Sequence, residues 1–368
     1  MKIAILDKFR GNLSLHKKYL KCRYSSNLKS LDLNEARENV DSEEELMEKH
    51  KLSEVQELKE RLVALNHNVK VLNSGKESEL YNGIKEFQPL LVINVSEERE
   101  VLFLEKNSVP YVGSNLETMV LSSDKYKTKR SVRNIDSLKT AEDYLIMSIE
   151  EACNILKIID KKKNYIAKPN LGRGSAGISD KAVIRQELLY SCNEKEKIEL
   201  IKDHFKRILF GLKQPVLVEE LINSGFLNDY KKENFKELTV GVLGYENPKV
   251  LLPLEIRKEE NSVLTFEAKM NDQAKFIVPA DIGSKLNRKL EDTALKIYRQ
   301  IGARDYLRID FIVYDEDLYF LETNTAPGLM MNHLNNGIAN SYLGIMAEKE
   351  GINLIEEIIK IAKKRYNF

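Results

Sequence analysis

The sequence predicts an α/β protein of two or three domains, the first of which is a doubly wound parallel sheet. The chain has 368 residues, and at about 150 residues per domain this length exceeds a single hydrophobic core. Short apolar strands alternate with helix-length segments, a pattern typical of a parallel sheet covered by helices. Apolar residues make up 42% and charged residues 31%, so the composition is that of a folded protein and excludes disordered or collagen-like chains.

The charge balance and the apolar runs exclude several functional classes. Lysine plus arginine number 58 against 57 aspartate plus glutamate, so no overall positive field attracts nucleic acid. No run approaches the roughly 18 apolar residues of a membrane span, and Ile3–Leu6 is ended by Asp7, so we expect neither an anchor nor a signal peptide. The three cysteines form no CxxC pair, and we therefore expect a protein of the reducing cytoplasm.

The elements of the first domain follow from hydrophobic periodicity. An amphipathic helix is predicted through Val55, Leu58, Leu62 and Leu65, which repeat at helical spacing. The other elements expected in this domain are strands 2–7, 68–72 and 89–95 and a helix over 77–87. We place the domain boundaries near residues 120 and 215, which gives domains 1–120, 121–215 and 216–368.

The remaining two domains are expected to mix strands and helices. Strands are predicted where short apolar runs are bounded by turn residues, and helices where the period is longer. The expected helices are 140–159, 186–210, 286–301 and 354–364, and the expected strands are 165–168, 178–184, 215–220, 238–243, 307–314 and 318–321.

A glycine-rich turn, Gly172–Gly177, joins two of these strands. It satisfies both the GxGxxG and the GxxxxG patterns, but no Lys-Ser/Thr pair follows it and Ile178–Ile184 has strand character. These departures exclude a Walker loop and a Rossmann fingerprint. A hairpin of this kind can cover a triphosphate with its backbone N–H groups while Lys168 supplies positive charge. A plain flexible hairpin gives the same pattern.

The strongest constellation of polar residues lies on two neighbouring strands. Alternation along a strand places Arg308 and Asp310 on one face, and Glu322 and Asn324 likewise. If the two strands pair as a hairpin, these side chains converge at one end. Two carboxylates and an amide oxygen are hard ligands that suit Mg²⁺ held together with substrate phosphates. A solvated polar face is the alternative, but the surrounding apolar residues favour burial, which is costly for an acid without a cation.

Other polar residues are undecided by themselves. Lys125 stands in a lysine-rich helix start that is more often simply solvated, and Lys269 is equally ambiguous. Glu219 and Glu220 end an apolar strand whose edge suits an adenine, although structural acids occupy such places too. His333 is compatible with a base, a ligand or a loop residue.

Taken together in chain order, these segments resemble the ATP-grasp superfamily, and within it the D-alanine-D-alanine ligase family. The motifs that carry the resemblance span roughly residues 109 to 330. They are Val109–Ser114, Asp124–Lys129, Ala167–Pro169, Gly174–Ser179, Val216–Glu219, Glu237–Gly244, Phe266–Lys269, Arg308–Phe311 and Leu321–Gly328. Each is weak alone, and their common order makes them specific.

The resemblance implies a three-domain fold with ATP held between the second and third domains. It implies that Lys125 and Lys168 contact the phosphates under a loop containing Gly174, Ser175 and Gly177. Glu219, Glu220, Leu221 and Ile222 would line the adenine, Glu237 would hold the ribose, and Lys269 would reach the γ-phosphate. Asp310, Glu322 and Asn324 would hold two Mg²⁺ ions, for which Mn²⁺ can substitute. Arg308, with Lys269 and Ser175, would form the catalytic set.

The activity implied is a two-step ligation. A carboxylate accepts the γ-phosphoryl group of ATP, and an amine then displaces phosphate from the acyl phosphate to form an amide. The expected substrates are amino acids or peptides, and the family suggests a homodimer. Neither nucleic acid nor membrane is expected as a partner.

The sequence departs from the family where the amino-acid substrates bind. The segment Asp7–Ser14 lacks the glutamate that holds the first ammonium group, Leu329–His333 replaces the family's residues after Pro-Gly, and Met270 replaces a common tyrosine. An insertion, Asn223–Lys236, weakens the ribose assignment of Glu237. The hypothesis is a ligase with altered amino-acid pockets. A diverged but genuine D-alanine-D-alanine ligase and a nucleotide-binding protein without ligase activity are the alternatives.

Overall fold

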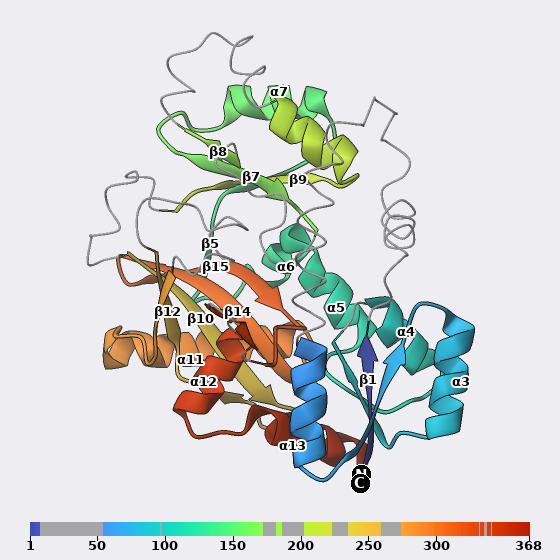
Figure 1. Ribbon diagram of the computed structural model, residues 1–368. Coiled ribbons are helices and arrows are strands. Elements are labelled where there is room, and N and C mark those ends of the chain that lie inside the picture. Colours follow the sequence, from blue (N-terminus) through green and yellow to red (C-terminus); the bar gives the residue numbers. More distant parts are fainter. Residues whose placement is uncertain are drawn as a thin grey trace.

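The computed structural model describes residues 1–7, 54–95, 98–171, 182–185, 202–222, 235–258, 274–330, 332–334, 337–339 and 341–368. Within these ranges the chain forms an N-terminal parallel sheet, a central antiparallel sheet and a larger C-terminal sheet (Figure 1). The charged segment 29–50, the glycine-rich turn and Lys269 lie outside the described residues.

The N-terminal sheet confirms the predicted doubly wound arrangement. Its strands β1 (Lys2–Asp7), β2 (Asn68–Asn73), β3 (Leu91–Asn94) and β4 (Tyr111–Val112) are parallel in the order β2-β1-β3-β4. Alternation along β1 places Ile3 and Ile5 in one core cluster, with the helix over 54–64, and Ala4 and Leu6 in another. The second cluster also contains apolar residues of α3 (Glu77–Phe87) and α4 (Glu98–Lys106).

Two consecutive helices lead from this sheet to the central one. They are α5 (Leu116–Ser123), capped by Asn115, and α6 (Lys125–Val132), capped by Asp124. Both caps accept a hydrogen bond from the backbone N–H three residues on, which satisfies a group that the helix itself leaves unpaired. α6 contacts strand β15 of the C-terminal sheet and helix α11, which packs on that sheet. The two helices therefore also contact the C-terminal sheet on their way to the central one.

The central sheet has the order β6-β9-β7-β8 and all its pairs are antiparallel. Its strands are β6 (Asp143–Ile146), β7 (Tyr165–Pro169), β8 (Val183–Ile184) and β9 (Val216–Glu220). Helix α7 (Ile149–Ile158) and the helical stretch 202–211, which ends in a π-helical turn at Arg207–Gly211, pack on it. β8 pairs with β7, as the predicted returning strand required.

Two sequence-based expectations change here. The helix predicted over 140–159 begins only at Ile149, because 143–146 pair with β9 and Ser148 caps the helix that follows. The strand predicted at 215–220, assigned to the third domain, pairs with β6 and β7 of the central sheet. The domain boundaries themselves stay a prediction.

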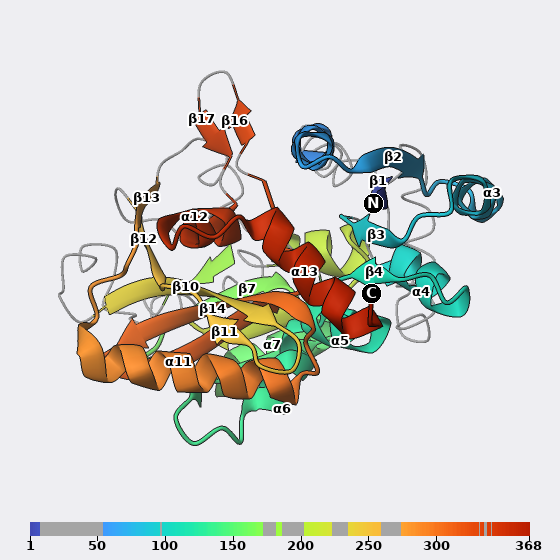
Figure 2. The same cartoon turned by 90° about the horizontal axis from the view of Figure 1, so that it is seen from below.

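The C-terminal sheet has seven strands in the order β13-β12-β10-β14-β15-β5, with β11 paired to β10. The strands are β5 (Lys139–Thr140), β10 (Phe235–Gly244), β11 (Lys249–Val250), β12 (Leu254–Lys258), β13 (Ala274–Ile277), β14 (Asp305–Tyr314) and β15 (Asp317–Asn324). Figure 2 shows α11 (Gly283–Gln300) lying along one face of this sheet, where it covers Val240, Leu307 and Ile309. The opposite face carries the polar residues described below.

The end of the chain packs between the first and third sheets. A short hairpin of β16 (Asn332–Leu334) and β17 (Gly337–Ala339) is followed by α12 (Tyr342–Lys349) and α13 (Leu354–Tyr366). Leu343, Met346, Ile355 and Ile358 share one core cluster with β1 and the helix over 54–64. In the part of the chain that the structure describes, no helix combines the length and the apolar character needed to cross a bilayer.

Candidate active site

The predicted polar hairpin is present. β14 and β15 are antiparallel, with Asp310 opposite Glu322 and Arg308 opposite Asn324. Residues that face each other in such a pair lie on the same side of the sheet. A register shift after Asp310 leaves Leu321 as an extra residue in β15, an irregularity that often adjusts the direction of a side chain near a functional site. The four side chains therefore share one face, opposite to α11.

Arg308 and Asp310 form a two-pronged ion pair at the centre of this face. The Nε atom of Arg308 donates to Oδ1 of Asp310 at 3.0 Å and its Nη2 atom donates to Oδ2 at 2.8 Å. The guanidinium also lies 5.3 Å from the centre of the Tyr342 ring. Burial acts to lower the pKa of Arg308, but Asp310 and Glu322 raise it above its usual range. Arg308 is thus a fixed positive charge held among acids.

The donor set fits a divalent cation. Asp310 and Glu322 supply carboxylate oxygens from facing positions, and Asn324 adds an amide oxygen that already accepts from the backbone N–H of Ala326 at 3.0 Å. The hydroxyl of Thr239 donates to Oδ1 of Asp310 at 2.5 Å, and a carboxylate retains further lone pairs for a metal. Among the described residues, no group of three or more His, Cys, Asp or Glu side chains gathers as a metal cluster, so this mixed set is the candidate.

A second charged cluster lies where α6 meets the central sheet. Glu219 on β9 accepts hydrogen bonds from two ammonium groups, Lys168 of β7 on Oε1 at 2.5 Å and Lys129 of α6 on Oε2. All three residues are buried. Burial alone would raise the pKa of Glu219, but the two lysine charges lower it to about 2. Burial lowers the pKa of Lys129, with Glu219 acting against that change.

Next to this cluster lies another buried carboxylate with its own cations. Asp143 faces Glu219 across the β6–β9 pair, and its Oδ1 atom accepts from Arg130 at 2.6 Å and from Arg133 at 3.4 Å. Its buried Oδ2 atom finds no hydrogen-bond partner among the residues that the structure describes. Burial raises the pKa of Asp143, against the opposing charges of Lys129, Arg130 and Arg133. Four cations thus face two carboxylates, with Lys129 and Lys168 buried and the side chains of Arg130 and Arg133 34% and 44% exposed. A local excess of positive charge of this kind attracts an anionic ligand.

The start of α6 is fixed to the end of β7, which brings Lys125 to the same place. Asp124 accepts from the side chain of Asn170 at 2.9 Å, and the backbone N–H groups of Lys125 and Tyr126 donate to the carbonyl and the side chain of Asn170. The Nζ atom of Lys125 lies 3.4 Å from the carbonyl oxygen of Pro169, the residue after Lys168. The two lysines predicted to contact phosphates are therefore neighbours.

An apolar patch joins the end of the central sheet to the β14–β15 hairpin. It contains Ile222 from the end of the central sheet and Ile312 from β14, with Leu321 and Tyr319 of β15 packed against it. Leu221 donates its backbone N–H to Asn164, and Glu220 forms an ion pair with Lys163 at 3.0 Å. Glu237 lies opposite Ile312, two residues from Thr239 on the same face of β10. An apolar wall with polar rims suits a flat heterocycle.

The structure thus places most of the predicted site residues that it describes in two groups, one around Glu219 and Lys168 and one on the β14–β15 hairpin. Gly174, Ser175, Gly177 and Lys269 lie outside the described residues, and His333 is described only as backbone in β16. Sequence reasoning did not single out Lys129, Asp143 or Thr239. The helical spacing of Lys125 and Lys129 was the one signal available for Lys129, because it places both on one face of α6.

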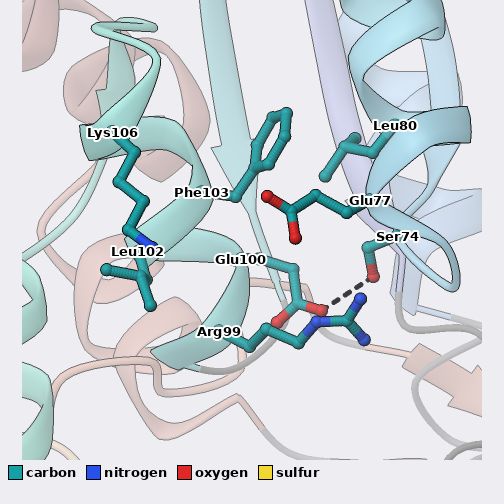
Figure 3. Close-up of a pocket in the computed structure, with 8 residues that line it drawn as sticks. All are labelled: Ser74, Glu77, Leu80, Arg99, Glu100, Leu102, Phe103 and Lys106. Atoms are coloured by element: carbon teal, nitrogen blue, oxygen red, sulfur yellow. Dashed lines mark hydrogen bonds between the residues drawn. The ribbon is translucent and has the colours of Figure 1, made fainter.

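A small cavity lies in the N-terminal domain, between α3 and α4 (Figure 3). Its lining includes the buried Glu100, which accepts from Ser74 at 2.9 Å, and Arg99, whose Nη2 atom lies 3.5 Å from the carbonyl oxygen of Gly75. The volume is about 60 Å³, whereas pockets for small molecules measure roughly 300–1,000 Å³. This cavity is therefore too small to be the principal ligand site.

Comparison with known proteins agrees with this geometry. Residues 201–360 match the family described as "D-ala D-ala ligase C-terminus". A D-alanine-D-alanine ligase of Fervidobacterium nodosum is 29% identical over 233 residues, which cover 61% of this chain and 66% of that protein. The enzyme of that name from Azobacteroides pseudotrichonymphae is 26% identical over 298 residues, which cover 79% of this chain and 81% of that protein. The first of these matches thus spans slightly less than two thirds of the relative's length.

Solved structures show the same fold. A D-alanine-D-alanine ligase of Bacillus anthracis, solved in complex with ATP, superposes with a TM-score of 0.60 at 16% identity and covers 99% of this chain and 98% of its own. The VanG D-Ala:D-Ser ligase of Enterococcus faecalis gives a TM-score of 0.56 at 17% identity and covers 98% of this chain and 99% of its own. The chain therefore has the ATP-grasp fold of these ligases. Its residues 201–360 are similar to the C-terminal part of the D-alanine-D-alanine ligase family.

Proposed function

We propose that this protein is an ADP-forming ligase that joins the carboxylate of one amino acid or peptide to the amine of another, using ATP and Mg²⁺. The observation that carries the proposal is the shared face of Arg308, Asp310, Glu322 and Asn324 on the β14–β15 hairpin. The local excess of lysine and arginine around Glu219 and Asp143 supports it on the nucleotide side. Charges of these two kinds are what a nucleotide triphosphate and its metal require.

The residues divide the work of the reaction. Lys125 and Lys168 bind phosphate oxygens, the Ile222–Ile312 patch receives the adenine, and Glu237 is the candidate for the ribose. Asp310, Glu322 and Asn324 hold Mg²⁺, which when bound neutralises phosphate charge. Arg308 stabilises the negative charge that develops on the acyl oxygen as the amine attacks, because its guanidinium is held in place before the reaction. The roles of Gly174, Ser175, Gly177 and Lys269 follow the family resemblance alone.

The substrates are proposed to differ from a pair of D-alanines. The residues after the first strand and after Pro327-Gly328 depart from those that hold the two amino acids in the family. The names of the curated relatives favour a second candidate, a genuine D-alanine-D-alanine ligase whose pockets have diverged.

The deciding experiment measures Mg²⁺-dependent ADP release by the purified chain with single and paired L- and D-amino acids and short peptides, while product masses are read alongside. ADP release that requires two substrates and yields a condensation mass supports the ligase and names its substrates. Efficient formation of D-alanyl-D-alanine supports the second candidate and contradicts altered pockets. ATP binding without turnover across the panel favours a nucleotide-binding protein that lacks ligase activity. Asn324→Ala serves as the inactive control.

A further inference from the structure

The buried carboxylate of Glu219 is shared by two lysines that are not equivalent. The side chain of Lys129 is 0% exposed, whereas that of Lys168 is 10% exposed. Lys129 comes from α6, and Lys168 comes from β7 beside Lys125. One carboxylate neutralises one ammonium group, so the pair of lysines carries one positive charge more than Glu219 can balance. Lys168 is the partner with access to a ligand.

We infer that Lys129 is a positioning residue: it is the permanent counter-ion of Glu219, and it thereby allows Lys168 to leave Glu219 and bind a nucleotide phosphate. The ligand in this inference rests on the proposed function. A buried carboxylate that loses its cation is strongly destabilised. Lys168 can therefore turn to a phosphate only if a second cation remains on Glu219, and Lys129 is that cation.

The surroundings of Lys129 hold it in this role. Asp143 lies opposite Glu219 in the β6–β9 register, and its charge favours the ammonium form of Lys129, as does that of Glu219. Lys129 is thus attracted by two carboxylates of the central sheet. Arg130 of α6 and Arg133, the residue that caps the end of this helix, both donate to Oδ1 of Asp143. Lys129 has no access to solvent and does not touch the nucleotide in this inference, so its effect passes through Glu219 and Lys168.

A variant without Lys129 should hold Lys168 on Glu219 and so keep it from the phosphates. In Lys129→Met, Glu219 keeps Lys168 as its counter-ion, and the phosphates lose one charge-assisted contact. We expect the Kd for Mg²⁺-AMP-PNP to rise about 10- to 100-fold, the range for loss of a hydrogen bond to a charged group, while the Kd for adenosine stays within about twofold. Lys127→Met is the matched control, because Lys127 lies on the same helix with its side chain 54% exposed.

The decisive variant is the double substitution Lys129→Met with Glu219→Gln. Neutralising Glu219 releases Lys168, so the double variant should bind AMP-PNP more tightly than Lys129→Met alone and within about fivefold of Glu219→Gln. A purely structural role for Lys129 predicts that the double variant binds at least as weakly as either single one, and that result would overturn the inference. Unchanged AMP-PNP binding by Lys129→Met would overturn it as well.

Two further measurements keep the test independent of folding and of the reaction. Lys129→Arg keeps a cation on Glu219 and should retain AMP-PNP affinity, while Lys129→Gln, which keeps a donor without the charge, should lose it even if Lys129→Met fails to fold. Circular dichroism of each variant reports folding. If the wild-type chain binds AMP-PNP but ligates nothing, the proposed reaction fails and this inference stands. If the wild-type chain does not bind AMP-PNP, both fail.

Discussion

At the scale of single residues, the role proposed for Arg308 can be tested by measuring ATP binding and turnover separately. Its guanidinium is held by Asp310 and by the face of Tyr342 before any substrate arrives. Arg308→Ala is expected to lower kcat by about 10²–10³, the usual effect of removing one group that stabilises an oxyanion, and to change the KM for ATP only a few-fold. Steady-state kinetics with ATP varied at saturating amino acid measures both. Arg308→Lys keeps the positive charge but loses the planar pair of N–H donors, so its kcat should lie between those of Arg308→Ala and the wild type. A large rise in KM with little change in kcat would instead make Arg308 a nucleotide ligand.

Asn324 and Glu322 test the metal assignment. Glu322→Ala or Asn324→Ala removes one oxygen ligand from a set that has few others, so turnover should fall below detection at ordinary Mg²⁺ concentrations. Glu322→Asp and Asn324→Asp, which keep an oxygen, should restore part of the activity at raised Mg²⁺ or Mn²⁺. Titration of activity against each metal ion shows this. Turnover by either alanine variant at the wild-type metal requirement contradicts the assignment.

The sequence predicted these residues better than it predicted their neighbours. Arg308, Asp310, Glu322 and Asn324 follow the period of two along a strand, which is a local property, and a short hairpin brings the strands together. Lys129 and Asp143 became relevant only through the docking of α6 on the central sheet and the register of β6 with β9. Such contacts join residues up to 90 positions apart, and local periodicity carries no information about them.

At the scale of elements, β9 carries a pH-dependent part of the stability. The pKa of Glu219 falls from 4.5 to about 2 in the folded protein. A lowered pKa means that the stabilisation is complete above the unfolded value and is lost as the pH falls through the folded value. The stability difference between wild type and Glu219→Gln should therefore be constant above about pH 5.5 and shrink between pH 4.5 and 2.

Urea unfolding at pH 7, 4 and 3 measures this difference. Glu86→Gln, which removes a carboxylate that is 77% exposed, controls for the general effect of losing an acid. A difference that stays the same from pH 7 to pH 3 would show that Glu219 is not held ionised by Lys129 and Lys168.

The two errors in predicting the elements from the sequence have one cause. The segment 140–159 is predicted as one helix, yet Thr140 belongs to β5 and Asp143–Ile146 form β6, because these residues pair with β15 and β9. β9 itself was recognised as a strand, but its sheet depends on partners that precede it in the chain. Strand existence is local, whereas strand pairing is set by tertiary contacts. The amphipathic helices over 54–64 and in α11 and α13 were recognised because one face of each packs on a core.

At the scale of the whole molecule, one buried ion pair of the third part of the chain also binds backbone groups of the first part. Asp305, fully buried at the start of β14, accepts from Arg365 of α13 at 2.9 and 2.6 Å and from the backbone N–H of Gly113 at 2.7 Å. Arg365→Met leaves this carboxylate without its cation and should lower the free energy of unfolding by about 3–5 kcal/mol. Urea unfolding of both proteins at pH 7 gives this difference.

Two variants accompany this measurement. Lys360 lies on the same helix, and its side chain is 78% exposed. Lys360→Met should therefore change the free energy of unfolding by no more than about 0.5 kcal/mol. Adding Asp305→Asn to Arg365→Met removes the unpaired charge, and asparagine tolerates the positive φ of 63° at this position. The double variant should regain part of the loss. No recovery would indicate that Arg365 acts through packing alone.

The same ion pair sets an order of events during synthesis. Arg365 also donates to the carbonyl oxygen of Tyr111, and 254 residues separate the two. At about 5–20 residues per second, a ribosome needs roughly 10–50 s to make that length of chain. During this interval the first sheet and the helix over 54–64 have been made, but their partners Ile355 and Ile358 do not yet exist. The apolar face that they leave open until then is a surface on which the nascent chain can aggregate.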